Sequence, residues 1–208
     1  MQRKYKTGFT LIEMLVVIGI IAVLMGSTVV GIGKMRKTAQ KARTQETVSN
    51  AATALSLIFQ KEMNWPKLIS QNFKSGSYGR LDENVCRAFV THKLLGLSTD
   101  PDSATIRLTG ADRCGLVDTW AQDVLKRTRA EGKGLKVPSG GTVQDHVLYY
   151  AIDVDGDGIT EASVGGANLK VRASAIVWSA GADGKEDPYK GGGGGDDVYS
   201  WSRGQVQK

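Results

Sequence analysis

The feature that most constrains this chain is a long apolar segment close to its N-terminus. From Met14 to Gly33, twenty consecutive residues carry no charge, and lysine and arginine residues flank the run on both sides. A run of this length crosses a bilayer as one helix. The basic residues ahead of it, Arg3, Lys4 and Lys6, predict that its front end stays in the cytoplasm. The sequence therefore predicts a single-pass membrane anchor.

Three kinds of N-terminal segment could account for this hydrophobicity. A cleaved secretory signal needs a small-residue site after a shorter apolar core, and Met25-Gly26-Ser27 is a poor substitute for one. A lipoprotein signal needs a cysteine soon after the run, and none is near. A plain signal anchor accounts for the hydrophobicity but leaves Glu13 unexplained.

Glu13 places a carboxylate beside the segment that most needs to be free of charge. A charged side chain inside a bilayer costs roughly 2.5–3.5 kcal/mol on insertion scales, and such residues usually have a partner. A cut between Gly8 and Phe9 would create an α-amine one helical turn from Glu13. Removing one partner of such a buried pair costs about 3–5 kcal/mol. Glu13 is therefore a candidate assembly residue, neutralised within its own chain or by a neighbouring one.

The stretch Gly8-Phe9-Thr10-Leu11-Ile12-Glu13-Met14-Leu15-Val16-Val17 resembles the class III signal of type IV pilins and of type II secretion pseudopilins. In that family a prepilin peptidase cuts after the glycine and methylates the new N-terminal phenylalanine. The resemblance implies cleavage after Gly8, N-methylation of Phe9 and a requirement for Glu13 in filament assembly. It also implies a type IV pilin fold of the α+β class, in which a long helix packs on a small antiparallel head.

The helical period continues beyond the apolar run. Apolar residues recur at i, i+3 and i+4 spacing at Val48, Ala51, Ala52, Leu55, Ile58 and Phe59. Neither Pro nor Gly interrupts residues 34 to 63, and Asn64-Trp65-Pro66 predicts the end because a residue before proline avoids the α region. We expect one helix from about Phe9 to about Met63, with its second half packed on the head.

The expected organisation is a leader over residues 1–8, a membrane or filament-core helix over 9–33, an amphipathic half over 34–65 and an α+β head over 66–208. In the head, turn-bounded runs rich in β-branched and aromatic residues predict strands over Val147 to Asp153 and Ala173 to Ser179. A short helix is expected over Leu81 to Leu95 and a short strand over Ile106 to Leu108. Residues 67–80 and 131–142 are expected to be loops. Asp118-Thr119-Trp120 resembles the family's Asp-Pro-Trp-Gly element, and a helical turn from Thr119 to Arg129 is the alternative.

Asp153, Asp155 and Asp157, followed by Gly158, resemble the front of an EF-hand calcium loop. The twelfth position holds Val164, where that loop needs a bidentate glutamate. A polar turn between two strands is the alternative. These three aspartates are therefore a possible second ion site.

A second acidic cluster lies in Ser179 to Trp201, around five consecutive glycines. Folding this loop back would bring Asp183, Asp196 and Asp197 together, and a hard cation such as calcium would relieve their repulsion. The segment resembles the C-terminal calcium loop of the major type II pseudopilin. The resemblance implies these three ligands, assisted by the carbonyls of Ala180 and Lys185. Because the loop carries an insert, Asp187 or Glu186 is an alternative ligand, and a solvated acidic loop is the other interpretation.

The two cysteines, Cys86 and Cys114, form a disulfide or are two separate buried thiols. Export of the head favours the disulfide, and no Cys/His cluster accompanies them that would indicate zinc. The net charge of +6 falls to +3 without the three basic residues at the N-terminus. The remaining basic residues are scattered, which argues against nucleic acid. His92 and His146 have no catalytic pattern around them, and we expect no enzymatic activity.

The resemblance therefore implies a structural subunit of a type II secretion pseudopilus. Such a protein is anchored in the bacterial inner membrane with its head in the periplasm. Its partners are copies of itself in a helical filament, minor pseudopilins, an inner-membrane assembly platform and prepilin peptidase. The alternatives are a type IV pilus subunit displayed at the cell surface and a minor pilin-like component of DNA uptake.

Overall fold

The structure is a computed structural model that describes residues 10–70, 73–94, 105–108, 113–121, 143–189 and 195–207. The chain divides into two compact units, Met1–Ala39 and Gln40–Lys208. The predicted leader and the predicted loop over 131–142 lie outside the described residues, as does most of the predicted turn from Thr119 to Arg129.

The helix α1 spans Leu11–Glu62, close to the bounds that the sequence predicts. Its C-terminus is set by Met63, which adopts a left-handed conformation with φ of 52°, a common way to end a helix. Trp65 and Pro66 follow, and the indole Nε1 of Trp65 donates a hydrogen bond of 2.5 Å to the carbonyl of Asp153. This bond joins the end of the helix to the residue that follows strand β4 (Tyr149–Ile152). In the part of the chain that is described, no helix is long and apolar enough to cross a membrane.

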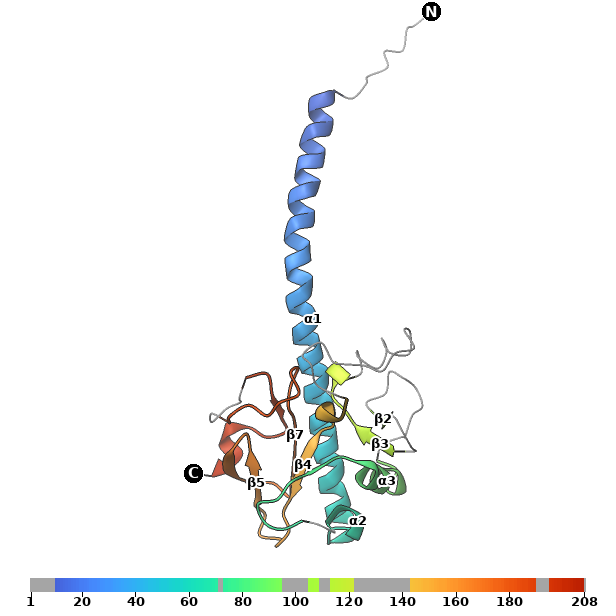
Figure 1. The fold of residues 1–208 in the computed structure, drawn as a ribbon, viewed down its shortest axis with the longest axis vertical. Coiled ribbons are helices and arrows are strands. Elements are labelled where there is room, and N and C mark those ends of the chain that lie inside the picture. The colour runs from blue at the N-terminus through green and yellow to red at the C-terminus, as the bar shows by residue number, and fades with distance from the viewer. Residues whose placement is uncertain are drawn as a thin grey trace, which may run out of the picture. The chain divides into compact units, whose positions relative to one another are not determined.

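A four-stranded antiparallel sheet is the centre of the head unit (Figure 1). Its strand order is β1-β4-β7-β8, with β1 at Gly79–Arg80, β4 at Tyr149–Ile152, β7 at Ala175–Ser179 and β8 at Val198–Tyr199. Two smaller sheets accompany it. One pairs β5 (Thr160–Val164), β6 (Ala167–Val171) and β9 (Val206–Gln207), and the other pairs β2 (Thr105–Leu108) with β3 (Arg113–Leu116). The antiparallel sheets and long helix confirm the predicted α+β class and are consistent with a pilin-like fold.

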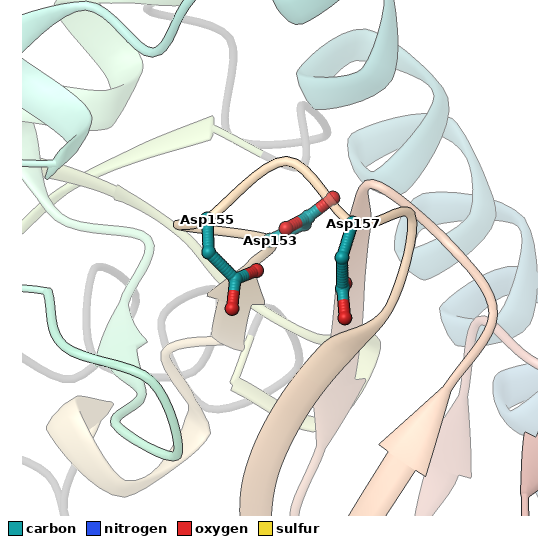
Figure 2. A group of neighbouring side chains, drawn as sticks. All are labelled: Asp153, Asp155 and Asp157. Carbon is teal, nitrogen blue, oxygen red and sulfur yellow. The ribbon is translucent and has the colours of Figure 1, made fainter.

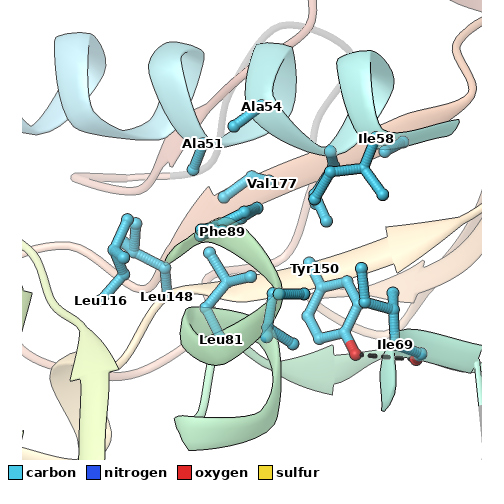
Figure 3. Packing of buried hydrophobic residues seen from close by; sticks show 14 of the residues in the cluster. Ala51, Ala54, Ile58, Ile69, Leu81, Phe89, Leu116, Leu148, Tyr150 and Val177 are labelled. Atoms are coloured by element: carbon cyan, nitrogen blue, oxygen red, sulfur yellow. Dashed lines mark hydrogen bonds between the residues drawn. The ribbon is translucent and has the colours of Figure 1, made fainter. Parts of the chain in front are cut away.

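One face of the central sheet packs on the second half of α1 (Figure 3). Val48, Ala51, Leu55 and Ile58 of the helix are fully buried, as the helical spacing predicts. Opposite them lie apolar side chains of the sheet and of the short helices α2 (Lys67–Ser70) and α3 (Glu83–Thr91), including Ile69, Phe89, Leu148, Tyr150, Ile152 and Val177. Fully burying one such large side chain contributes about 1.5–3 kcal/mol, so this contact fixes residues 48–58 of α1 on the sheet.

The opposite face of the central sheet is buried as well. Tyr149, Ala151, Ile176 and Trp178 pack with residues of β5 and β6 in a second apolar cluster. Because side chains alternate between the two faces of a strand, β4 and β7 are buried at every position. Burial on both faces explains why these two strands are continuous apolar runs in the sequence.

Several expected bounds differ from the observed ones. The predicted loop over 67–80 contains α2 and β1, and the predicted helix over 81–95 is shorter, at Glu83–Thr91. The helix α3 contacts β3, which places the segments of the two cysteines next to each other. Cys86 is buried, whereas the side chain of Cys114 lies outside the described residues. The disulfide between them stays a prediction.

Candidate functional site

The start of α1 is closed by a reciprocal pair of hydrogen bonds between Thr10 and Glu13. The backbone N–H and the hydroxyl of Thr10 each donate to Glu13 Oε2 at 2.8 Å. In return, the Glu13 N–H donates to Thr10 Oγ1 at 3.3 Å. This arrangement is a capping box, which satisfies N–H groups that the first turn leaves unpaired. Gly8 and Phe9 lie outside the described residues, so their predicted processing is not placed in the structure.

The first part of α1 exposes a nearly continuous apolar surface. Each large apolar side chain that is described between Leu11 and Met25 is at least 47% exposed. An apolar surface of this length is unusual on an isolated soluble chain and marks a site of interaction with protein or lipid. No other part of the chain that the structure describes covers these side chains.

In the head, three carboxylates meet in the loop between β7 and β8. Asp187, Asp196 and Asp197 each offer an oxygen, and these oxygens lie within 4.8 Å of one another. Gly195 permits this approach, because a Cβ at that residue would lie 1.6 Å from Asp187 Oδ2. Gly195 also adopts φ of +43°, a conformation that side chains disfavour. The missing side chain and the backbone conformation of Gly195 therefore let Asp187 lie against Asp196 and Asp197.

Asp197 is the most buried of the three carboxylates. It is only 3% exposed, and its Oδ2 accepts hydrogen bonds from the Asp187 N–H at 3.0 Å and the Tyr199 hydroxyl at 2.9 Å. Its Oδ1 is buried without a hydrogen-bond partner among the described residues. Burial raises the pKa of Asp197 to about 7, and the neighbouring Asp187 and Asp196 contribute to the rise. A buried, unpaired oxygen beside two further carboxylates fits a hard cation with oxygen ligands.

The structure places the predicted ligand Asp183 outside this group. Its Oδ1 accepts a hydrogen bond of 2.9 Å from the Lys185 N–H, and the group consists of Asp187, Asp196 and Asp197. Glu186, the other alternative from the sequence, accepts a hydrogen bond of 2.7 Å from the Trp178 indole. Asp187 therefore occupies the third position of the cluster, and a ligand role for Asp183 stays a prediction.

The second acidic group forms the turn between β4 and β5, with Asp153 between Asp155 and Asp157 (Figure 2). Asp153 is buried, and its two oxygens accept hydrogen bonds from the N–H groups of Gly156 and Gly158 at 2.7 and 2.8 Å. Burial raises the pKa of Asp153. These hydrogen bonds are those of a polar turn between two strands, which is the alternative that the sequence offers. Ion binding at these three residues stays a prediction.

Comparison with known proteins adds one match. Residues 3–29 match the family model described as the prokaryotic N-terminal methylation motif. No curated protein and no solved structure matches the chain significantly. The match supports a type IV pilin-like protein, for which the motif implies processing by prepilin peptidase and assembly into a filament. Proteins of this kind are structural rather than enzymatic, and the motif is shared by pseudopilins and pilus subunits.

Proposed function

We propose that this chain is a pseudopilin, a structural subunit of a type II secretion pseudopilus. It is made as a precursor, cut after Gly8 and methylated on Phe9. Residues 9–33 hold it in the inner membrane with the head in the periplasm, and α1 then polymerises to drive secretion. The methylation motif over residues 3–29, which overlaps the start of the 52-residue helix α1, supports the pilin-like class. The observation that carries the choice of a pseudopilin is the group of carboxylates formed by Asp187, Asp196 and Asp197 in the head.

The exposed apolar surface of α1 supports assembly. Each Leu, Ile, Val or Met side chain described between Leu11 and Met25 is at least 47% exposed, and in a bilayer such helix surfaces associate through van der Waals packing. Before assembly the lipid covers this surface, and in the filament the helices of neighbouring subunits replace the lipid. Glu13 then meets the α-amine of a neighbouring Phe9, which compensates the cost of a buried carboxylate.

The acidic cluster of the head supports a pseudopilin over a pilus subunit. We propose that Asp187, Asp196 and Asp197 hold a calcium ion. The ion would neutralise carboxylates that repel one another. Its role is structural, because no substrate-binding group accompanies the cluster among the described residues.

The partners follow from the same proposal. They are further copies of this chain, minor pseudopilins, the inner-membrane assembly platform and the peptidase. The methylation motif favours a type IV pilus subunit equally, so that is the second candidate function. A DNA-uptake role would need a basic face with aromatic residues, and the sequence offers no basic cluster on the head.

The test is processing in a cell that supplies prepilin peptidase. The full-length chain is expressed with and without the peptidase, and the N-terminus of the product is read by mass spectrometry. We expect a chain that begins with N-methylated Phe9 only when the peptidase is present. Gly8→Ala should be cut in part, and the bulkier Gly8→Leu should leave the precursor intact.

Two results would contradict the proposal. An uncut wild-type chain in the presence of active peptidase would remove the pilin-like assignment. A chain that is cut at another residue would leave Glu13 at the wrong distance from the new amine.

A further inference from the structure

Three buried polar side chains, Asp118, His146 and Ser179, form a cluster that the proposed function does not use. All three are about 1% exposed. Asp118 Oδ2 accepts a hydrogen bond of 2.8 Å from the Ser179 hydroxyl and lies 3.0 Å from His146 Nδ1. The cluster joins segments that are far apart in the sequence: the residues after β3, the residues before β4 and the end of β7.

Hydrogen bonds from the residues that follow it in the chain hold Asp118 in place. Its Oδ1 accepts hydrogen bonds from the N–H groups of Trp120 and Ala121 at 3.1 and 3.0 Å, as the N-cap of a short helical turn does. The adjacent Thr119 donates to the carbonyl of Gln40 in α1 at 2.8 Å and also contacts the Thr44 hydroxyl. The Asp118 carboxylate is therefore fixed relative to the head part of α1.

Ser179 connects Asp118 by hydrogen bonds to the loop that carries Asp187, Asp196 and Asp197. Its hydroxyl donates to Asp118 and accepts a hydrogen bond of 3.1 Å from the Gly181 N–H. Gly181 adopts φ of +69°, and a Cβ there would lie 2.6 Å from the Asp196 carboxyl carbon. The next residue, Ala182, donates its N–H to Asp196 Oδ2. A short path of hydrogen bonds thus runs from Asp118 through Ser179 and this turn to Asp196.

His146 supports the other end of the same turn. Its Nε2 is buried without a hydrogen-bond partner among the described residues, and a Cβ at Gly184 would lie 3.5 Å from that nitrogen. Gly184 adopts φ of +70°. The side chains of Asp145 and His146 thus lie next to Gly184, and the other imidazole nitrogen of His146 faces Asp118.

We propose that Asp118, acting through Ser179 and His146, is a positioning residue for the cation-binding loop. The inference rests on the proposed calcium site. Asp187, Asp196 and Asp197 repel one another in the absence of an ion, and the turn from Ser179 to Gly184 holds Asp196 in place against that repulsion. Removal of groups that orient a metal ligand typically lowers metal affinity by about 10–100-fold.

The test removes the hydroxyl that connects Asp118 to the turn. The full-length chain is purified in detergent as wild type, Ser179→Ala and Ser179→Thr, and calcium affinity is measured by titration calorimetry. Terbium luminescence is the second readout, because Tyr199 donates to the ligand Asp197 and is a nearby sensitiser. Thr160→Val is the matched control, since Thr160 is also buried and loses one hydrogen bond, to the Ala173 carbonyl.

We expect Ser179→Ala to bind calcium at least about tenfold more weakly, and Ser179→Thr, which keeps the hydroxyl, to retain most of the affinity. Thr160→Val should bind as the wild type does. In the metal-free chain, amide exchange at Gly181 should accelerate in Ser179→Ala alone, a change that needs no metal to be seen.

Three results would overturn the inference, and they are distinguishable. Wild-type affinity in Ser179→Ala would leave the calcium site standing and remove the positioning role. An equal loss in Thr160→Val would show that general destabilisation is responsible. A wild-type chain that binds neither calcium nor terbium would refute the proposed site itself, and the inference would fall with it.

Discussion

Glu13 caps α1 and, in the proposed filament, pairs with an amine, so a substitution can remove both roles at once. In the chain with its leader, its carboxylate caps α1 through Thr10. In the proposed filament, its charge pairs with an amine. The first role was detectable in the sequence, because Thr10-x-x-Glu13 has the spacing of a capping box. The energetic cost of a carboxylate in a bilayer predicts only the second role.

Glu13→Gln and Glu13→Val separate the two roles. Glutamine keeps a capping oxygen but has no charge, whereas valine loses both. We expect both variants to be cut and to stay with the membrane, and both to assemble poorly when filaments are counted by electron microscopy. Filaments of normal length in Glu13→Gln would contradict the pairing with an amine and leave capping as the role of Glu13.

The raised pKa of Asp197 predicts how the free energy of unfolding depends on pH when no metal is bound. Its pKa is raised to about 7 in the folded chain, against about 3.9 for an unperturbed aspartate. Between these values the folded state holds a proton that the unfolded state has released, so the free energy of unfolding falls as pH rises. Acidification through pH 7 should therefore stabilise the metal-free head.

The measurement is denaturant unfolding in the presence of a chelator at several pH values between about 5 and 8. We expect the fall in unfolding free energy to be smaller in Asp197→Asn, which cannot ionise. Identical pH dependence in wild type and variant would show that Asp197 ionises as an exposed aspartate does.

At the scale of elements, the sequence predicted those with long periodic patterns. The spacing of Val48, Leu55 and Ile58 identified the buried face of α1, and the aromatic and β-branched runs identified β4 and β7. The strands β1, β8 and β9 have two residues each, which is too short for a period to appear. Their pairing depends on tertiary contacts that no local pattern encodes.

The acidic loop shows the same limit at a single site. The resemblance implied that Asp183 would join Asp196 and Asp197, with Asp187 or Glu186 as the alternative. The structure places Asp187 beside that pair, an approach that depends on the backbone at Gly195, and the ligand role of Asp183 stays a prediction. A run of consecutive glycines has no side-chain pattern from which the neighbours of Asp196 and Asp197 could be predicted.

Calcium should stabilise the head through this loop. At a free concentration of about 100 times Kd, binding adds about 2.7 kcal/mol, which corresponds to a rise in Tm of roughly 5–10 °C for a domain of this size. Asp187→Asn should abolish most of the shift when melting is followed by circular dichroism. Asp183→Asn is the matched control and should keep it. The reverse order of effects would restore Asp183 as the ligand.

At the scale of the whole molecule, the two compact units differ in chemistry. The unit Gln40–Lys208 has a buried core of its own, whereas the apolar side chains described between Leu11 and Met25 in the other unit are exposed. In the proposed filament, the exposed helix would polymerise, and the head would carry what distinguishes a pseudopilus from a pilus.

The most direct test of the proposed function is deletion of this chain in its native host. Proteins released into the medium are quantified, and surface fibres are counted by electron microscopy, with wild-type and Gly8→Leu chains used for complementation. We predict that secreted proteins accumulate inside the cell, that surface fibres remain, and that only the wild-type chain restores secretion. Normal secretion combined with loss of surface fibres would contradict the account and identify a pilus subunit.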